Sequence, residues 1–245
     1  ASAAGLTAGT ITPTGASVGT KQGFSIIKYT GNQTSGAKVP HGLSQTPDLT
    51  IVKQLTGTAE SWRVRHAYSG DLTKTLYLNQ TVANTSNTEY ISGADSTTIT
   101  LSSGLAGINA NADYIVYAWH NVPGLQKFGK YTGNLNADGP FIELGFRPAL
   151  VWLKETGNAG YWNIYDNKRN PSNLTDRILW ANDDYEENDS DIIGSTGSNA
   201  IDLLSNGFKL RSNKTGTNRS GGTYIYCAWA EQPSFNLYGA SSNAR

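Results

Sequence analysis

The sequence has one cysteine, no methionine and only three histidines in 245 residues. The single cysteine, Cys227, cannot form a disulfide within the chain, and its apolar neighbours in YIYCAWA predict a buried structural thiol. The histidines lack the HxH or HExxH spacing of transition-metal sites, and neither GxSxG nor a phosphate-binding glycine loop occurs. We therefore expect a protein that is not an enzyme and needs no cofactor. The absence of methionine, even at position 1, indicates a processed product or a part of something longer.

Charged residues are also scarce. They make up 16% of the chain, and 19 basic residues balance 19 acidic ones. A chain without net positive charge does not attract nucleic acid or an anionic membrane surface. No apolar run approaches the ~18 residues that a membrane-spanning helix needs. The sequence therefore predicts neither nucleic-acid binding nor membrane insertion.

What the sequence does contain is an internal repeat. The pentapeptide KYTGN occurs at residues 28–32 and again at 130–134. Three further pairs of blocks follow in the same order: TPDLTIVK with RPALVWLK, SWRVRHA with YWNIYDN, and YIVYAWHNVP with YIYCAWAEQP. Matched blocks whose spacing varies slightly indicate a duplication with insertions and deletions in loops. We predict two homologous units, residues 23–123 and 127–234.

Both units show the pattern of β-structure. Short runs rich in Val, Ile, Thr and aromatic residues alternate with clusters of Gly, Asn, Asp and Pro. In LLSNGFKL, an Asn-Gly pair between apolar runs is typical of a β-hairpin. The prediction is an all-β fold with two antiparallel, jelly-roll-like β-sandwiches in tandem. The polar ends, residues 1–22 and 235–245, are expected to be an extended arm and a tail that pack only on something else.

A carboxylate-rich loop occurs only in the second unit. The segment WANDDYEENDSD, residues 180–191, carries six acidic side chains. Hard cations bind several oxygen ligands close together, so Asp183, Asp184 and Glu186 are a possible calcium site. The segment lacks the glycine of an EF-hand loop at the sixth position. A solvated loop without metal is our prediction, and calcium or a pair of glycosidase carboxylates are the alternatives.

A second candidate is YWNIYDNKRNP, residues 161–171, which precedes that loop. Pyranose rings have apolar faces and hydroxyl edges, and an aromatic platform beside polar side chains suits both. The same composition also arises at the end of a hairpin. The candidate ligand-binding residues are Tyr161, Tyr165, Asp166, Arg169, Trp180 and Tyr185.

The combination of GFSIIKYTGN, KYTGNLNADGPFIELGFRPALVWLKE, NIYDNKRNP and GGTYIYCAWAEQP resembles a family of tailed-bacteriophage virion proteins. Members are usually labelled tail fibre or phage structural proteins, and the duplicated KYTGN block is their hallmark. The resemblance covers roughly residues 23–245. It implies a protein on the exterior of the virion, in contact with other virion proteins, and it brings no catalytic residues.

Two functions follow from this resemblance. The first is a tail-fibre adhesin, expected as a homotrimer, that binds a host surface receptor or polysaccharide. The aromatic and acidic segments of the second unit favour it. The second is a capsid decoration (cement) or head-fibre protein, whose N-terminal arm would grip neighbouring capsid subunits. The extended N-terminal segment and the near-zero net charge favour it. The adhesin is our first prediction and decoration of the head is the alternative.

Overall fold

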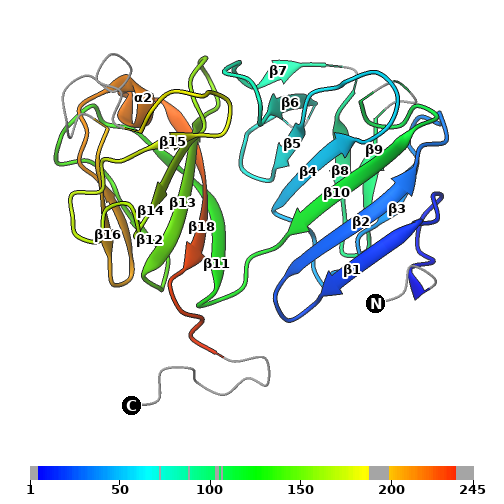
Figure 1. The fold of residues 1–245 in the computed structure, drawn as a ribbon, viewed down its shortest axis with the longest axis horizontal. Helices are drawn as coiled ribbons and strands as arrows, with labels where there is room; N and C mark the ends of the chain where they lie inside the picture. The colour runs from blue at the N-terminus through cyan, green and yellow to red at the C-terminus, as the bar shows by residue number, and fades with distance from the viewer. Residues whose placement is uncertain are drawn as a thin grey trace. The chain divides into compact units, whose positions relative to one another are not determined.

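The chain forms two β-rich units in a computed structural model, shown in Figure 1. The structure describes residues 5–71, 73–87, 89–102, 105, 107–187 and 199–235. Unit 1 comprises Ala1–Asn79 and Asn84–Asn121, and unit 2 comprises Gln80–Ala83 and Val122–Arg245. The predicted all-β fold with two tandem antiparallel sandwiches is confirmed.

Unit 1 consists of a seven-stranded sheet and a three-stranded sheet, coloured from blue to green in Figure 1. The larger sheet has the order β1 (Gly15–Gly19), β2 (Phe24–Thr30), β10 (Asp113–Trp119), β4 (Leu49–Gln54), β5 (Arg63–His66), β6 (Lys74–Tyr77) and β7 (Thr85–Ser86). The smaller sheet has the order β3 (Lys38–Pro40), β9 (Thr98–Leu101) and β8 (Ile91–Ala94). All described pairings are antiparallel.

The core of unit 1 lies between these two sheets. Every second residue of β10 is buried, so Tyr114, Val116 and Ala118 point to one face, as the two-residue period of a strand requires. They belong to one apolar cluster with Ile99 and Leu101 of the smaller sheet. Burial of such side chains contributes roughly 25 cal/mol per Å² of apolar surface, which holds the sheets face to face.

Unit 2 repeats this plan with fewer strands. Its larger sheet has the order β11 (Gln126–Thr132), β18 (Thr223–Ala230), β13 (Pro148–Glu155), β14 (Asn163–Asp166) and β15 (Leu179–Trp180). Its smaller sheet has the order β12 (Phe141–Glu143), β17 (Gly207–Leu210) and β16 (Ile201–Leu204), and a short helix, α2 (Thr215–Asn218), precedes β18. An apolar cluster again joins the two sheets.

The strand order makes the two units equivalent element by element. The sequence β2-β10-β4-β5-β6 of unit 1 corresponds to β11-β18-β13-β14-β15 of unit 2, and β3-β9-β8 corresponds to β12-β17-β16. Within the described residues, β1 and β7 have no counterpart in unit 2. The predicted hairpin in LLSNGFKL is present as β16 and β17, with Leu204 paired to Gly207. Its two-residue loop is therefore Ser205–Asn206, one residue earlier than Asn-Gly indicates.

The prediction of an N-terminal arm was wrong for the described residues 5–22. Strand β1 pairs with β2 over its whole length, from Gly15 opposite Lys28 to Gly19 opposite Phe24. Ile11 is buried, and the apolar side chains on β1 pack against the core of unit 1. The segment looked polar because an edge strand needs only a few apolar residues on one face. The predicted C-terminal tail lies, apart from its first residue, outside the described residues.

The repeated pentapeptide KYTGN makes the same contacts in both units. Its tyrosines, Tyr29 and Tyr131, are buried and stack on a tyrosine of β10 and β18, with 5.0 Å between ring centroids in each unit. Their hydroxyls donate to the backbone carbonyls of Ile108, in the loop before β10, and of Thr217, in α2 before β18. Buried hydroxyls need such acceptors, so the tyrosine fixes each of these segments to the core.

The asparagine of KYTGN holds the same two segments, the loop before β10 and helix α2. The backbone N–H of Asn32 donates to Oδ1 of Asn109 at 3.0 Å, and the Asn109 amide donates back to Oδ1 of Asn32 at 3.1 Å. Asn134 and Asn218 repeat this reciprocal pair at 2.8 and 3.0 Å. We call the tyrosine and this asparagine pair the loop clamp of each unit. The recurrence of KYTGN is therefore explained by the fold.

Candidate functional site

Three of the six predicted ligand-binding residues form a cluster of aromatic rings at the edge of unit 2. Strand β15 pairs with β14 and places Trp180 opposite Asn163, whose Oδ1 accepts a hydrogen bond from the indole Nε1 at 3.1 Å. The ring centroids of Tyr161, Trp180 and Tyr185 lie 6.0–6.1 Å apart, with each pair of rings meeting edge to face. This geometry is the one that aromatic quadrupoles favour. We call these residues the three-ring cluster.

The three rings differ in what they offer to solvent. Trp180 is only 6% exposed, whereas Tyr161 is partly buried and Tyr185 is 38% exposed. The buried tryptophan therefore supports the cluster, and Tyr185 presents its outer surface. A ligand on this cluster would contact the two tyrosines.

The predicted residues Asp166 and Arg169 form a separate, charged group at the end of β14. Oδ1 of Asp166 accepts the backbone N–H groups of Lys168 and Arg169 at 2.8 and 2.9 Å, and its Oδ2 pairs with the Arg169 guanidinium. Nε of Arg169 lies 3.1 Å from Glu187, which also pairs with Arg177 at 3.5 Å. Asp166 thus closes a turn, and its charge is already paired.

Tyr165 cannot contact a ligand, and we remove it from the candidate site. Its side chain is fully buried in the core of unit 2, and its hydroxyl donates to the carbonyl of Asn199 at 2.6 Å. Burial also raises the pKa of this phenol far above its usual value. The period of strand β14 gives the reason, because alternate residues point inward and Tyr165 is on the inward face.

The acidic loop provides no described metal site. Within the described part of the chain, no three His, Cys, Asp or Glu side chains come close enough to hold a metal ion. Asp183 accepts the backbone N–H of Asp184 at 3.0 Å, and Glu186 is exposed. Two further acidic residues that the sequence places here, Asp189 and Asp191, lie outside the described residues.

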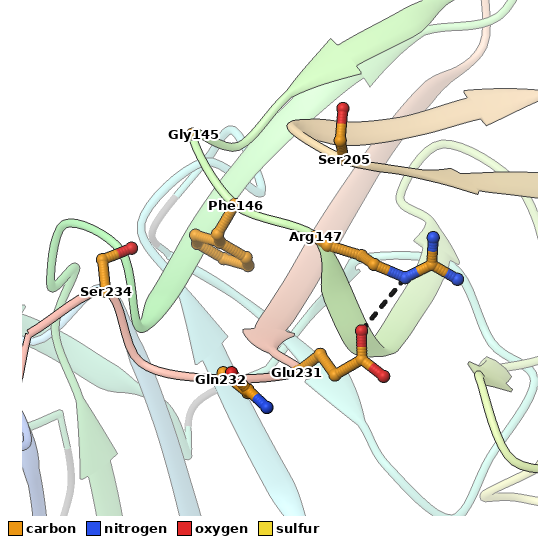
Figure 2. A pocket seen from close by; sticks show the side chains of 7 residues that line it. All are labelled: Gly145, Phe146, Arg147, Ser205, Glu231, Gln232 and Ser234. Carbon is orange, nitrogen blue, oxygen red and sulfur yellow. Dashed lines mark ion pairs between the residues drawn. The ribbon is translucent and has the colours of Figure 1, made fainter. Parts of the chain in front are cut away.

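Sequence reasoning missed a pocket of about 260 Å³ in unit 2, shown in Figure 2. It lies where the segment before β13, the β16–β17 turn and the segment after β18 meet. Figure 2 shows the Phe146 ring beside the ion pair of Arg147 and Glu231, whose Nε and Oε2 are 3.1 Å apart. Gly145, Ser205, Gln232 and Ser234 complete the lining.

A signal for this pocket was present in the repeat alignment. RPALVWLK aligned with TPDLTIVK puts Arg147 opposite Thr46, and the last pair of blocks puts Glu231 opposite Asn121. At these two aligned positions, unit 2 therefore has charged residues where unit 1 has uncharged ones.

A family model for a domain of unknown function, DUF7483, matches residues 1–233. The chain belongs to the DUF7483 family. The matched range includes both units and the segment that contains β1, so the DUF7483 model corresponds to the whole tandem pair. No curated protein and no solved structure matches this chain. Among the described residues of this DUF7483 protein, no helix has the length and apolar character needed to cross a membrane.

Proposed function

We propose that this chain is a non-enzymatic protein of the outer surface of a tailed-phage particle, and that unit 2 binds a host surface receptor or polysaccharide. The observation that carries the proposal is the three-ring cluster, with the half-exposed ring of Tyr185 supported by two further rings. Tyrosine at a surface combines a large apolar face with a polar hydroxyl, so it suits ligands that have both apolar and hydroxyl surfaces.

The comparison between the units supports the same proposal. Tyr161 lies opposite Ser61 in the repeat alignment, and Trp180 corresponds to Tyr77, because β15 is equivalent to β6. At these two positions unit 1 therefore has one aromatic ring where unit 2 has two. The β-sandwich fold therefore does not itself require the three-ring cluster.

The alternative, decoration of the phage head, rested on an N-terminal arm that would grip neighbouring capsid subunits and on the near-zero net charge. Residues 15–19 instead form β1 and are paired with β2 in the same unit. The near-zero charge suits an adhesin equally well, and we do not propose the alternative.

Replacement of Tyr185 by alanine tests the proposal. The labelled full-length chain is added to cells of candidate host bacteria, and the bound fraction is measured by flow cytometry. Tyr185→Ala should weaken binding by about tenfold or more, since aromatic anchors contribute more than ~1 kcal/mol.

Tyr68→Ala is the matched control. Tyr68 lies in unit 1, and its exposed fraction is 38%, equal to that of Tyr185. Its replacement should leave binding unchanged. Equal losses in both variants, or no loss in Tyr185→Ala, would contradict the assignment of the site.

A further inference from the structure

The pocket beside Phe146 brings a hydrogen-bond donor and an acceptor together. Glu231 is fixed on both sides, because Oε2 pairs with Arg147 and Oε1 accepts the Asn167 amide at 2.8 Å. A second contact joins the two backbones, since the N–H of Glu231 donates to the carbonyl of Arg147 at 2.9 Å. The two charged groups are thus held side by side before any ligand arrives.

Hydrogen-bonding capacity remains on both charged groups. Among the described residues, only Nε of Arg147 has an acceptor, so the four N–H groups on its Nη atoms remain available. The carboxylate of Glu231 has further lone pairs besides the two in use. The two side chains are 43% and 38% exposed, so a small molecule can reach both.

This pair of groups matches a vicinal diol. Each hydroxyl of a sugar is both a donor and an acceptor, so one hydroxyl accepts from arginine while its neighbour donates to glutamate. Glu231 would repel an anionic ligand and Arg147 would repel a cationic one, so the pocket favours a neutral ligand. Phe146 lines the pocket but is only 5% exposed, so a sugar would be held mainly by polar contacts, to which the hydroxyls of Ser205 and Ser234 add.

The size of the pocket limits the ligand to about one ring. Its volume of about 260 Å³ is below the ~300–1,000 Å³ typical of sites for drug-sized ligands. The fold does not require the two charged residues, because unit 1 has Thr46 and Asn121 at the positions of Arg147 and Glu231. Phe146, by contrast, belongs to the apolar core of unit 2.

We propose that this pocket binds a single neutral pyranose unit, with Arg147 and Glu231 holding two neighbouring hydroxyls. The proposal rests on the proposed function in that the sugar would belong to the same host glycan, and it adds a second subsite on unit 2.

The test is a titration of the ¹⁵N-labelled full-length chain with the methyl glycosides of glucose, galactose, mannose and N-acetylglucosamine, followed by NMR. At least one of them should, at millimolar concentration, shift the amide signals of Phe146, Arg147, Ser205 and Glu231. Methyl glucuronide, which carries a carboxylate, should bind about tenfold more weakly than methyl glucoside.

Two variants examine the diol contact. Arg147→Lys keeps the charge and loses the planar fork, and Glu231→Gln keeps the shape and loses the charge. Each should weaken binding by about tenfold, whereas Thr46→Val, the matched control in unit 1, should not change it. Both replaced side chains are well exposed, so thermal unfolding should show folded proteins.

The outcomes separate the two proposals. Shifts around Tyr161 and Tyr185 without shifts in the pocket overturn the pocket and leave the proposed function standing. Shifts in the pocket combined with full cell binding by Tyr185→Ala overturn the proposed site and leave the pocket standing. No shift in the pocket with any of the four neutral glycosides, or unchanged binding in Arg147→Lys, overturns the pocket proposal.

Discussion

Unit 1 and unit 2 share the order of their equivalent strands and the loop clamp, but one equivalent strand position holds a charged side chain in unit 1 and an uncharged one in unit 2. On β5 of unit 1 this place holds Arg63, whose side chain is only 5% exposed and is paired with Glu60 and Glu89. On β14 of unit 2 it holds Asn163, which binds the indole of Trp180. One unit thus buries a charge cluster where the other buries an uncharged amide and a tryptophan.

This difference between Arg63 and Asn163 shows which features of the position the fold depends on. The guanidinium of Arg63 lies over the ring of Tyr77, 5.8 Å from its centroid, and Tyr77 is the counterpart of Trp180. An aromatic ring on the equivalent strands β6 and β15 is therefore kept, while its polar partner changes from a cation to an amide. The fold specifies a polar partner for the ring and not one particular side chain: the contact is cation–π in unit 1 and a hydrogen bond in unit 2.

Replacing Arg63 should have the largest effect. Arg63→Met would leave the carboxylates of Glu60 and Glu89 without their buried cation, and the cost should be about 3–5 kcal/mol of unfolding free energy. Urea unfolding followed by circular dichroism measures it. The equivalent change in unit 2, Asn163→Ala, leaves no buried charge and should cost only about 1–2 kcal/mol. A larger loss from Asn163→Ala would reverse our comparison of the two units.

The loop clamp should show a smaller difference of the same kind. Asn218 donates from its amide to Asn134, Asn136 and Ser212, whereas Asn109 donates to Asn32 and Thr34.

Both clamp asparagines are fully buried, so truncation leaves polar groups without partners at ~1–3 kcal/mol. We expect Asn218→Ala to cost about 2–3 kcal/mol and Asn109→Ala somewhat less, measured by urea unfolding. Losses below about 1 kcal/mol in both variants would show that the clamp is dispensable.

The smallest effect should appear in the pH dependence of unit 2. Lys154 is fully buried, and its ammonium donates to the carbonyls of Thr81 and Gly160 at 3.1 and 2.9 Å. Burial lowers the pKa of this lysine to about 8, and the charge of Glu155 opposes the shift. Its counterpart in unit 1, Lys53, is less buried and donates to the carbonyl of Glu60.

The direction follows from proton counts. Above about pH 8 the folded chain releases the Lys154 proton, while the unfolded chain keeps it up to about pH 10.4. The unfolded state then binds more protons, so the free energy of unfolding rises with pH in this range.

Compared with Lys154→Met, the natural chain should gain about 1–2 kcal/mol between about pH 7 and pH 9.5. Lys53→Met should leave that gain unchanged. The same pH dependence in the natural chain and in Lys154→Met would show that Lys154 does not cause it.

Much of the fold could be predicted from the sequence, because strands and duplications leave local signals. The alternation of apolar residues predicted β-structure, and the ordered blocks predicted two equivalent units. Cys227 is buried, as its apolar neighbours indicated. The hairpin was found with its loop displaced by one residue, since an Asn-Gly pair does not specify which residues continue the ladder.

The candidate site was predicted less well, because its members depend on which face of a strand each residue occupies. Tyr161 and Tyr185 contact Trp180, but Tyr165 points into the core. Asp166 and Arg169 are close in sequence to Tyr161 and still form a separate group. Arg147 and Glu231 are more than 80 residues apart in the sequence, and only β13 and β18, adjacent in the sheet, bring them together.

The sequence by itself thus determined the fold class, the duplication and the absence of an excess of charge, since these follow from local periodicity and composition. The tertiary structure alone decided which tyrosine is buried, that the N-terminal segment completes a sheet, and that a pocket forms beside Phe146. Those features depend on hydrogen bonds and packing between residues far apart in the chain, and such contacts leave no pattern in neighbouring residues.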